Sequence, residues 1–268
     1  MGGRGTFDFS GETAIVTGST SGIGRGIATA LANADANVVI NARTHADVET
    51  TATELESLGD GQVIGVAADL ADPDAIEHLV ETTIDRVGPV TILVNNAAVW
   101  TEEASMIEAG LEDWDLTMDV NVRAQYYASK LVSMQMIEQG VEGSIINLTS
   151  QTGDRRTGGR GFYGVSKTAI NGLTWRMAHD LAPHGIRMNA VSTDVTESRQ
   201  LWHEANNIAS DDPDRTADDV LTEWGEALPL GRLGQPEDLA DAVLFLCSDR
   251  ASYVVGTILR VSGGGNLQ

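Results

Sequence analysis

Seven short runs of apolar and β-branched residues recur along the chain, and a helix-length segment separates each run from the next. They lie at 13–18, 37–42, 62–68, 91–96, 144–150, 186–192 and 257–263. Strands that alternate with helices are typical of a parallel sheet, because parallel neighbours need a crossover between them. We therefore predict a doubly wound α/β fold (a Rossmann fold) with seven parallel strands and helices on both faces.

The alternation of predicted strands and helices continues through all 268 residues without a linker or a long repeat, so we expect one domain over 1–268. It is interrupted at 197–229, where a long polar and acidic stretch separates two strands. In such sheets ligands bind at the carboxyl ends of the strands. We therefore interpret 197–229 as a lid over a substrate, with an ordinary solvated loop as the alternative.

The sequence is strongly acidic, with 39 Asp and Glu residues against 17 Lys and Arg residues and a formal net charge of −22. Such a surface repels phosphate backbones and anionic membranes, so we expect neither nucleic-acid nor membrane partners. Lys130 and Lys167 are the only lysines. A carboxylate-rich, lysine-poor surface is what we expect of a protein from a halophilic source, where salt screens the self-repulsion.

Cys247 is the single cysteine and lies in the apolar run AVLFLC, which excludes an intrachain disulfide and predicts a buried thiol. No stretch approaches the roughly 18 continuous apolar residues of a membrane span. The segment 1–12 lacks the apolar core of a signal peptide, so we expect a cytoplasmic protein. The five histidines show no paired spacing, and no metal site is expected.

A glycine-rich segment, TGSTSGIG at 17–24, follows the first apolar run directly and precedes a helical pattern. Glycines let the backbone turn tightly and approach a ligand closely, and the helix behind them directs free N–H groups at an anion. A merely structural turn is the alternative. Because the strand before it and the helix after it are both present, we favour a site for a dinucleotide pyrophosphate.

Two further motifs stand at the ends of other apolar runs: NNAA at 95–98 and YGVSK at 163–167. Together with TGSTSGIG they resemble the short-chain dehydrogenase/reductase family, and the stretch 229–256 is also similar to that family. The resemblance runs from about residue 10 to the end of the chain. It implies an NAD(P)-dependent oxidoreductase that moves a hydride between nicotinamide and a carbonyl or alcohol carbon.

The resemblance implies a catalytic tetrad of Asn121, Ser150, Tyr163 and Lys167. Tyr163 would transfer the proton, although a free phenol with a pKa of about 10 is a poor base. Lys167 lies one helical turn further on, so its charge is expected to lower that pKa while the amine holds the nicotinamide ribose. Ser150 would bind the substrate oxygen, and Asn121 would hold a water that connects Lys167 to solvent.

A second pair, Tyr126 and Lys130, has the same four-residue separation. No strand-end serine precedes it, and it lies in the middle of a predicted helix. We therefore expect Tyr126 to be packed and Lys130 to be exposed.

The cofactor is predicted to be NADP(H), with NAD(H) as the alternative. No carboxylate follows the second run, where one would hold the ribose hydroxyl of NAD, and Arg43 stands there to pair with a 2′-phosphate. The family pattern is altered at Thr193-Asp194 and at Ser262. The residues expected to bind the cofactor are Gly18, Ser19, Thr20, Ser21, Gly22, Ile23, Asn41, Arg43, Thr44, Asp69, Leu70, Asn95, Ala97, Tyr163, Lys167, Val195 and Ser198.

The substrate pocket is expected to be rich in hydrogen-bonding groups, which favours a sugar, polyol or sugar acid. The expected substrate-binding residues are Trp100, Ser150, Thr152 and His203, and the further pocket-facing residues are Gln151, Asp154, Trp202, Glu204 and Asn206. A 3-oxoacyl thioester reductase is the alternative, because Arg155, Arg156 and Arg160 offer a basic patch for carrier phosphates.

A third hypothesis is a non-catalytic nucleotide sensor on the same fold, which the presence of both Tyr163 and Lys167 disfavours. The resemblance also implies a homotetramer, assembled through the helices at about 113–139 and 162–182.

Overall fold

A seven-stranded parallel sheet forms the centre of the protein, which is described here from a computed structural model covering residues 7–101, 105–154, 160–210 and 212–267. The strands run in the order β3-β2-β1-β4-β5-β6-β7. Their bounds are Thr13–Val16 (β1), Asn37–Ala42 (β2), Val63–Ala67 (β3), Ile92–Asn95 (β4), Gly143–Ser150 (β5), Ile186–Thr193 (β6) and Ile258–Val261 (β7). Each strand lies on a predicted run, and the fold class is confirmed.

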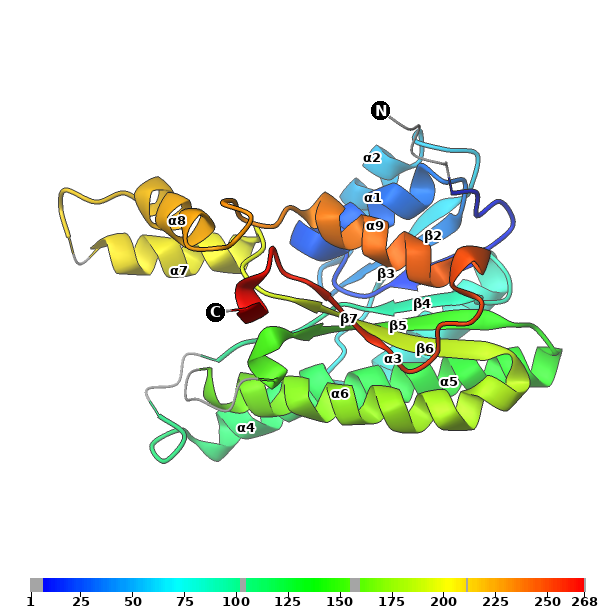
Figure 1. Ribbon diagram of the computed structural model, residues 1–268. Helices are drawn as coiled ribbons and strands as arrows, with labels where there is room; N and C mark the ends of the chain where they lie inside the picture. The colour runs from blue at the N-terminus through cyan, green and yellow to red at the C-terminus, as the bar shows by residue number, and fades with distance from the viewer. Residues whose placement is uncertain (1–6, 102–104, 155–159, 211, 268) are drawn as a thin grey trace.

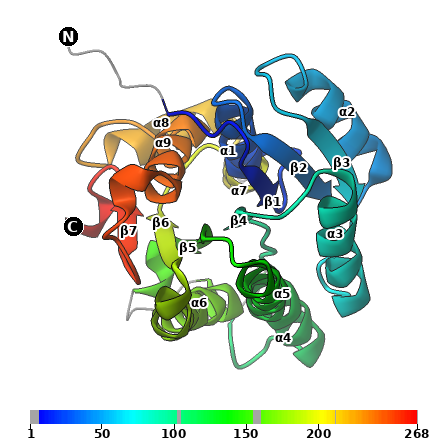
Figure 2. The ribbon, with the colours of Figure 1, turned by 90° about the vertical axis from the view of Figure 1, so that its right-hand side faces the viewer.

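Helices cover both faces of the sheet (Figures 1 and 2). Side chains alternate between the faces along each strand, so Val38 and Ile40 join one core while Val39 joins the other. One face carries α1 (Gly22–Ala32), α2 (His45–Leu55) and α9 (Pro236–Cys247). The other carries α3 (Pro73–Arg86), α4 (Leu111–Met118), α5 (Ala124–Gln139) and α6 (Gly161–Leu181). Both cores consist mainly of aliphatic side chains.

The strand order reverses at β1, which pairs with β2 on one side and with β4 on the other. The connections after these central strands leave toward opposite faces of the sheet. This leaves a crevice at their carboxyl ends, where ligands bind in open α/β sheets. The glycine-rich segment and the NNAA segment both lie there, because they follow β1 and β4 directly.

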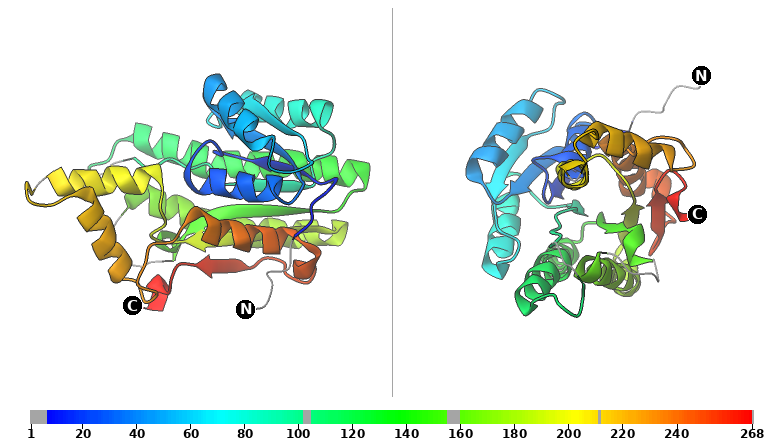
Figure 3. Two further views of the ribbon diagram at one scale, coloured as in Figure 1. Left: turned by 90° about the horizontal axis from the view of Figure 1, so that it is seen from above. Right: turned by 90° about the vertical axis from the view of Figure 1, so that its left-hand side faces the viewer.

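The segment 197–229 is a pair of helices rather than a loop: α7 (Arg199–Ser210) and α8 (Ala217–Glu226) extend beyond the carboxyl ends of the strands (Figures 1 and 3). They pack on each other through a small core of their own, made by Leu201, Ala205, Val220 and Leu221. Thr216 starts α8 with a capping box that it forms with Asp219. The segment is thus helical and not a loop, and we use lid only as a name for this pair of helices.

The predicted helix over 113–139 is interrupted by one turn of π-helix, Asp119–Arg123, between α4 and α5. This turn brings Asn121 into the protein interior, where its side chain is fully buried. Cys247 is buried as expected, and burial raises the pKa of its thiol to about 12. Among the described residues no helix is both long enough and apolar enough to cross a bilayer.

Candidate active site

The glycine-rich turn is held in place by the segment that follows β4. The amide nitrogen of Asn96 donates hydrogen bonds to the main-chain oxygens of Thr17 (2.8 Å) and Gly18 (3.1 Å). Gly18 has φ 63° and Gly22 has φ 54°, a left-handed conformation that favours glycine. A Cβ atom on Gly24 would overlap Asn96 Nδ2 and the Gly18 oxygen. The sequence motif is therefore explained by backbone conformation and close contact.

The turn opens toward an anion site. Ser21 caps α1 with an extended backbone and makes no side-chain hydrogen bond to it, and the first turn of α1 contains no acidic residue. The free N–H groups at this end of the helix favour a negative charge. They lie in a cavity of about 1200 Å³ that also contains Tyr163 and Lys167. A dinucleotide fits this arrangement, with its pyrophosphate at the turn and its nicotinamide near Tyr163.

Three predicted cofactor residues line the cavity at the ends of β2 and β3: Arg43, Asp69 and Leu70. Arg43 is exposed, and within the described ranges no carboxylate pairs with it. Asn41 also reaches the cavity, although it is buried and its amide nitrogen donates to the oxygen of Val66 (3.2 Å). An unpaired guanidinium at this position is the arrangement that would hold a 2′-phosphate.

Three predicted cofactor residues are not among those that line the cavity. Ser19 is fully buried: its hydroxyl donates to the oxygen of Val16 (2.6 Å) and accepts from the N–H of Asn41 (3.0 Å). Asn95 directs its amide inward, to Ser129 Oγ and Asn147 Oδ1, each at 2.9 Å. Thr44 is the residue before α2. The side chains of Ser19 and Asn95 brace the strand ends from within.

The other predicted cofactor residues do line the cavity. They are Gly18, Thr20, Ser21, Gly22, Ile23, Ala97, Tyr163, Lys167, Val195 and Ser198.

Tyr163 and Lys167 lie one turn apart on α6 and face the cavity together. Lys167 Nζ is 5.3 Å from the centroid of the Tyr163 ring and donates to the oxygen of Leu148 (2.9 Å). Burial lowers the pKa of Lys167 to about 8. Burial also raises the pKa of Tyr163, opposed by the charge of Arg160 and by a hydrogen bond with Ser150. In this structure Arg160, rather than Lys167, is the cation that opposes burial.

Ser150 stands at the end of β5 and is not among the residues that line the cavity. It is mostly buried, and its hydroxyl accepts from the N–H of Thr152 (3.2 Å) and donates to Thr152 Oγ1 (3.1 Å). The Ser150 hydroxyl also opposes the rise in the pKa of Tyr163 that burial causes, which relates the predicted serine to the predicted proton donor. Thr152 lines the cavity as expected.

Asn121 uses its side chain for positioning. Its amide oxygen accepts from the N–H of Val99 (2.7 Å), and its amide nitrogen donates to the Val99 oxygen (2.8 Å) and to Ser166 Oγ (3.1 Å). Asn121 thereby fixes the segment after β4 against α6, the helix that carries the catalytic pair. The residue is close to that pair, but these contacts occupy its side chain.

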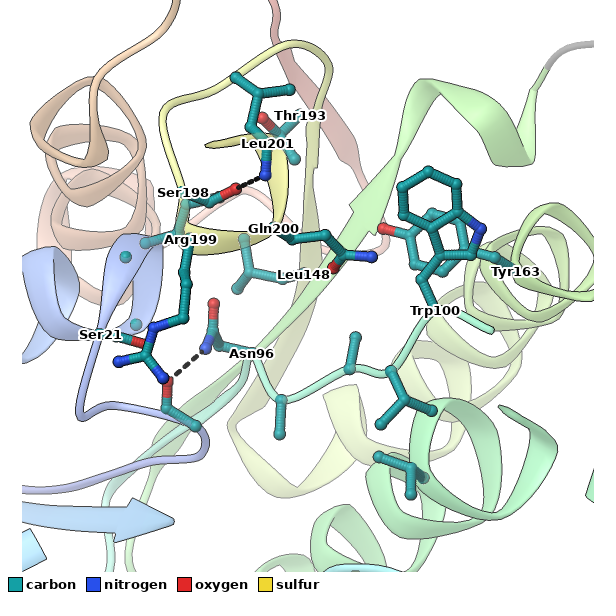
Figure 4. A pocket seen from close by; sticks show the side chains of 18 of the residues that line it. Ser21, Asn96, Trp100, Leu148, Tyr163, Thr193, Ser198, Arg199, Gln200 and Leu201 are labelled. Carbon is teal, nitrogen blue, oxygen red and sulfur yellow. Dashed lines mark hydrogen bonds between the residues drawn. The ribbon is translucent and has the colours of Figure 1, made fainter. Parts of the chain in front are cut away.

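Trp100, Arg160 and residues of the lid line the same cavity as Tyr163. Figure 4 shows Trp100 beside Tyr163. The Trp100 ring lies 6.5 Å from the Tyr163 ring, centroid to centroid, and the guanidinium carbon of Arg160 is 4.4 Å from the Trp100 centroid. Arg160 also pairs with Glu204 of α7 at 3.1 Å. One arginine therefore contacts both the lid and the aromatic wall beside Tyr163.

Two of the lid residues expected in the pocket, His203 and Glu204, line the cavity. The other expectations are wrong. Trp202 packs between α7 and α8, and the amide nitrogen of Asn206 donates to the oxygen of Trp202. Trp202 and Asn206 lie on a different face of α7 from the residues that line the cavity. Because the segment was interpreted as a loop, the sequence could not indicate which positions share a face.

Gln151 and Asp154 are also not among the residues that line the cavity. Gln151 is buried, and Asp154 pairs with Arg260 at 2.8 Å and accepts from Asn171 at 3.1 Å. Arg155 and Arg156 fall outside the described residues.

The cavity also contains lid residues that the sequence analysis missed: Arg199, Gln200 and Asn207. Arg199 is the first residue of α7. The altered Thr193-Asp194 pair lies here too, where Thr193 shares a hydroxyl hydrogen bond of 2.6 Å with Thr196.

The second pair, Tyr126 and Lys130, is placed differently from Tyr163 and Lys167. Tyr126 is 45% exposed, so the expectation that it is packed within the chain is wrong. Lys130 is exposed, as expected, and lies 6.0 Å over the ring of Tyr127. Across the described part of the chain, no three His, Cys, Asp or Glu side chains form a cluster suited to a metal ion.

Comparisons with known proteins agree with this geometry. Residues 18–266 match the family model described as Enoyl-(Acyl carrier protein) reductase. L-xylulose reductase from Mesocricetus auratus is 37% identical over 258 residues, covering 95% of this chain and 96% of that protein. A 3-oxoacyl-[acyl-carrier-protein] reductase from Synechocystis is 33% identical over 260 residues, covering 94% and 96%.

A solved structure has the same fold over nearly its whole length. L-sorbose reductase from Gluconobacter frateurii, in complex with NADPH and L-sorbose, superposes with a TM-score of 0.91 at 30% identity, covering 96% of this chain and 97% of that one. Sequence motifs, sheet order, site geometry and relatives all lead to one assignment. The chain belongs to the short-chain dehydrogenase/reductase family of NAD(P)-dependent oxidoreductases.

Proposed function

We propose that this protein is an NADPH-dependent reductase of a ketose or a related polyhydroxylated carbonyl compound. The observation that carries the proposal is the polar lining of the cavity that contains Tyr163 and Trp100, to which Thr152, Arg160, His203 and Glu204 contribute. Several donors and acceptors beside one aromatic ring suit a substrate with many hydroxyl groups. Similarity to L-xylulose reductase and L-sorbose reductase supports the same substrate class.

The proposed mechanism assigns one task to each residue of the site. When bound, nicotinamide supplies the hydride for the carbonyl carbon. Tyr163 donates its phenolic proton to the carbonyl oxygen, and Ser150, whose hydroxyl lowers the pKa of Tyr163, would bind the same substrate oxygen. Lys167 would hold the nicotinamide ribose, and the charge of Arg160 stabilises the phenolate that forms. Alcohol oxidation runs the same steps in reverse.

NADPH is the proposed cofactor because Arg43 offers an unpaired guanidinium at the end of β2, where no carboxylate competes for a ribose hydroxyl. The turn at Gly18 and Gly22 and the start of α1 would hold the pyrophosphate. Asp69 and Leu70 would line the adenine side.

The substrate test compares L-sorbose, L-xylulose, D-erythrulose and acetoacetyl-CoA, each with NADPH and with NADH, by loss of reduced-nicotinamide absorbance. We expect the highest kcat/KM with a ketose and NADPH. A kcat/KM for acetoacetyl-CoA that exceeds every ketose by tenfold or more would replace this proposal with the thioester reductase. That alternative is supported by the Synechocystis relative, but Arg160, which it needs for carrier phosphates, is paired with Glu204.

We further propose that the protein is a cytoplasmic homotetramer from a halophilic source. Exposed apolar side chains on α5 and α6, among them Tyr126, Met134 and Trp175, support contacts between copies through these helices. The charge of −22 supports adaptation to concentrated salt. Light scattering in molar KCl tests the assembly, and a mass below that of four chains would contradict it.

A further inference from the structure

The start of the lid lies directly against the glycine-rich turn. A Cβ atom built on Gly22 would lie 3.6 Å from the Cβ atom of Ser198, and Ser198 is followed at once by the first residue of α7, Arg199. The N–H of Leu201 donates to Ser198 Oγ at 3.2 Å, which fixes the first turn of the helix. The lid therefore begins at the turn where a pyrophosphate would bind.

Arg199 directs its charge back across the cavity. In Figure 4 its side chain extends from the start of α7 toward the turn at Ser21, and both residues line the same cavity. Arg160 of this cavity pairs with Glu204, and Arg25 pairs with Glu54 nearby. Within the described ranges, by contrast, no hydrogen bond or ion pair occupies the Arg199 side chain.

Although the chain has 39 acidic and 17 basic residues, the guanidinium of Arg199, like those of Arg43 and Arg176, has no carboxylate partner among the described residues. The cavity wall opposite Arg199 also lacks a negative charge, because the first turn of α1 has no acidic residue and Ser21 does not cap it. Free N–H groups on one side and a free guanidinium on the other form a complementary site for a doubly charged anion.

We propose that Arg199 binds the pyrophosphate of the dinucleotide and thereby fastens the lid over the bound cofactor. This inference rests on the proposed function only in requiring a dinucleotide in the cavity, and it adds a cofactor contact that comes from the lid. Arg43 and Arg199 then have separate partners: Arg43 holds the 2′-phosphate, and Arg199 holds the bridge between the two nucleotides.

Lid position and cofactor binding are coupled by this contact. Glu204 lies on the same helix as Arg199 and pairs with Arg160 beside Trp100. An anion that draws the start of α7 onto the turn at Gly22 therefore also fixes the wall of the substrate site. We expect cofactor to bind before substrate.

The test uses nucleotide fragments, measured as dissociation constants by titration calorimetry on the full chain without substrate. ADP-ribose contains the pyrophosphate but no 2′-phosphate, and 2′-AMP contains a 2′-phosphate but no pyrophosphate. We expect R199Q to weaken ADP-ribose, NADH and NADPH about tenfold or more, and to leave 2′-AMP within about twofold, because a charge-assisted hydrogen bond contributes about 1.5–3 kcal/mol.

Two matched variants serve as controls. R43Q is expected to show the reverse pattern, with weaker 2′-AMP and NADPH and unchanged ADP-ribose. R176Q removes an exposed arginine from α6 and is expected to change none of the four affinities. Hydrogen exchange provides the readout of the lid: ADP-ribose should protect the amides of α7 in the wild type and not in R199Q.

An R199Q variant that binds ADP-ribose within about twofold of the wild type would overturn this inference and leave the proposed reductase standing. A wild-type protein with no affinity for NADPH would overturn both. Loss of 2′-AMP binding in R199Q, equal to the loss for ADP-ribose, would also overturn it, because Arg199 would then act through general charge.

Discussion

Lys167 Nζ lies 5.3 Å from the centroid of the Tyr163 ring and donates a hydrogen bond to the main-chain oxygen of Leu148. In this arrangement the amine of a deeply buried lysine has one carbonyl as its partner and faces the cavity. A cation held there is costly for the protein alone and useful to a bound cofactor. The buried charge of Lys167 thus raises the free energy of the folded, ligand-free protein, and we expect a bound cofactor to offset this destabilisation.

Replacing Lys167 by Met should stabilise the ligand-free protein at neutral pH. Burial lowers the pKa of this lysine from 10.5 to about 8. Below pH 8 Lys167 is protonated in both the folded and the unfolded chain, so the full free energy of burying the charged amine destabilises the folded state. Between the two pKa values Lys167 loses its proton in the folded chain first, so this destabilisation becomes smaller as the pH rises. Urea denaturation should show K167M more stable by up to about 3 kcal/mol at neutral pH, with the difference vanishing in strong alkali. A less stable K167M at neutral pH would contradict this.

Replacing Arg160 by Met should shift alcohol oxidation to higher pH. Burial raises the pKa of Tyr163, and the charge of Arg160 opposes that rise. Oxidation needs the phenolate, so the rising limb of the plot of kcat against pH should shift to higher pH when the charge of Arg160 is removed.

The matched control for this prediction is E204Q, which removes the partner of Arg160 and keeps the cation beside Trp100. The rising limb of the kcat profile of E204Q should not shift to higher pH. An R160M profile that coincides with the wild type would show that Arg160 acts only on the structure of the lid.

Replacing Arg43 by Gln should remove the preference for NADPH. We expect kcat/KM for NADPH to fall by about tenfold to a hundredfold, since a charged contact to phosphate is lost, while kcat/KM for NADH stays within about twofold. Steady-state kinetics with each cofactor measures the ratio. An equal loss with both cofactors would move the role of Arg43 away from the 2′-phosphate.

Activity should persist or increase in molar KCl. The charge of −22 leaves strong repulsion between carboxylates in dilute buffer, and salt screens it. Assays across a KCl series, with matched thermal melts, measure both effects. Activity that is highest in dilute buffer and collapses in molar salt would refute the halophilic interpretation.

The strands, and the position of Tyr163 and Lys167 on one helix, could be predicted because each depends on local pattern. Apolar runs identify buried strands, and the spacing between Tyr163 and Lys167 places both on one face of a helix. The motif around Gly24 predicted a turn, but the reason for glycine there is Asn96, which is 72 positions further along the chain. Close contacts of this kind are visible only in three dimensions.

The direction of individual side chains was less predictable. Asn95 belongs to a recognised motif and nevertheless turns inward to Asn147, because a buried amide at a strand end must find partners. The composition of 197–229 distinguished this segment from the rest of the chain, yet it did not predict the helices α7 and α8. Because no helix was predicted there, the sequence could not show that His203 faces the cavity while Trp202 packs against α8.

In the proposed reaction Tyr163 transfers the proton while NADPH reduces a ketose. Its most direct test is Y163F, with kcat measured at saturating NADPH and ketose and the dissociation constant of NADPH measured in parallel. We predict a loss of kcat of about a hundredfold or more, with NADPH affinity within about twofold of the wild type. A Y163F enzyme that retains kcat within tenfold, with its NADPH affinity intact, would contradict the account.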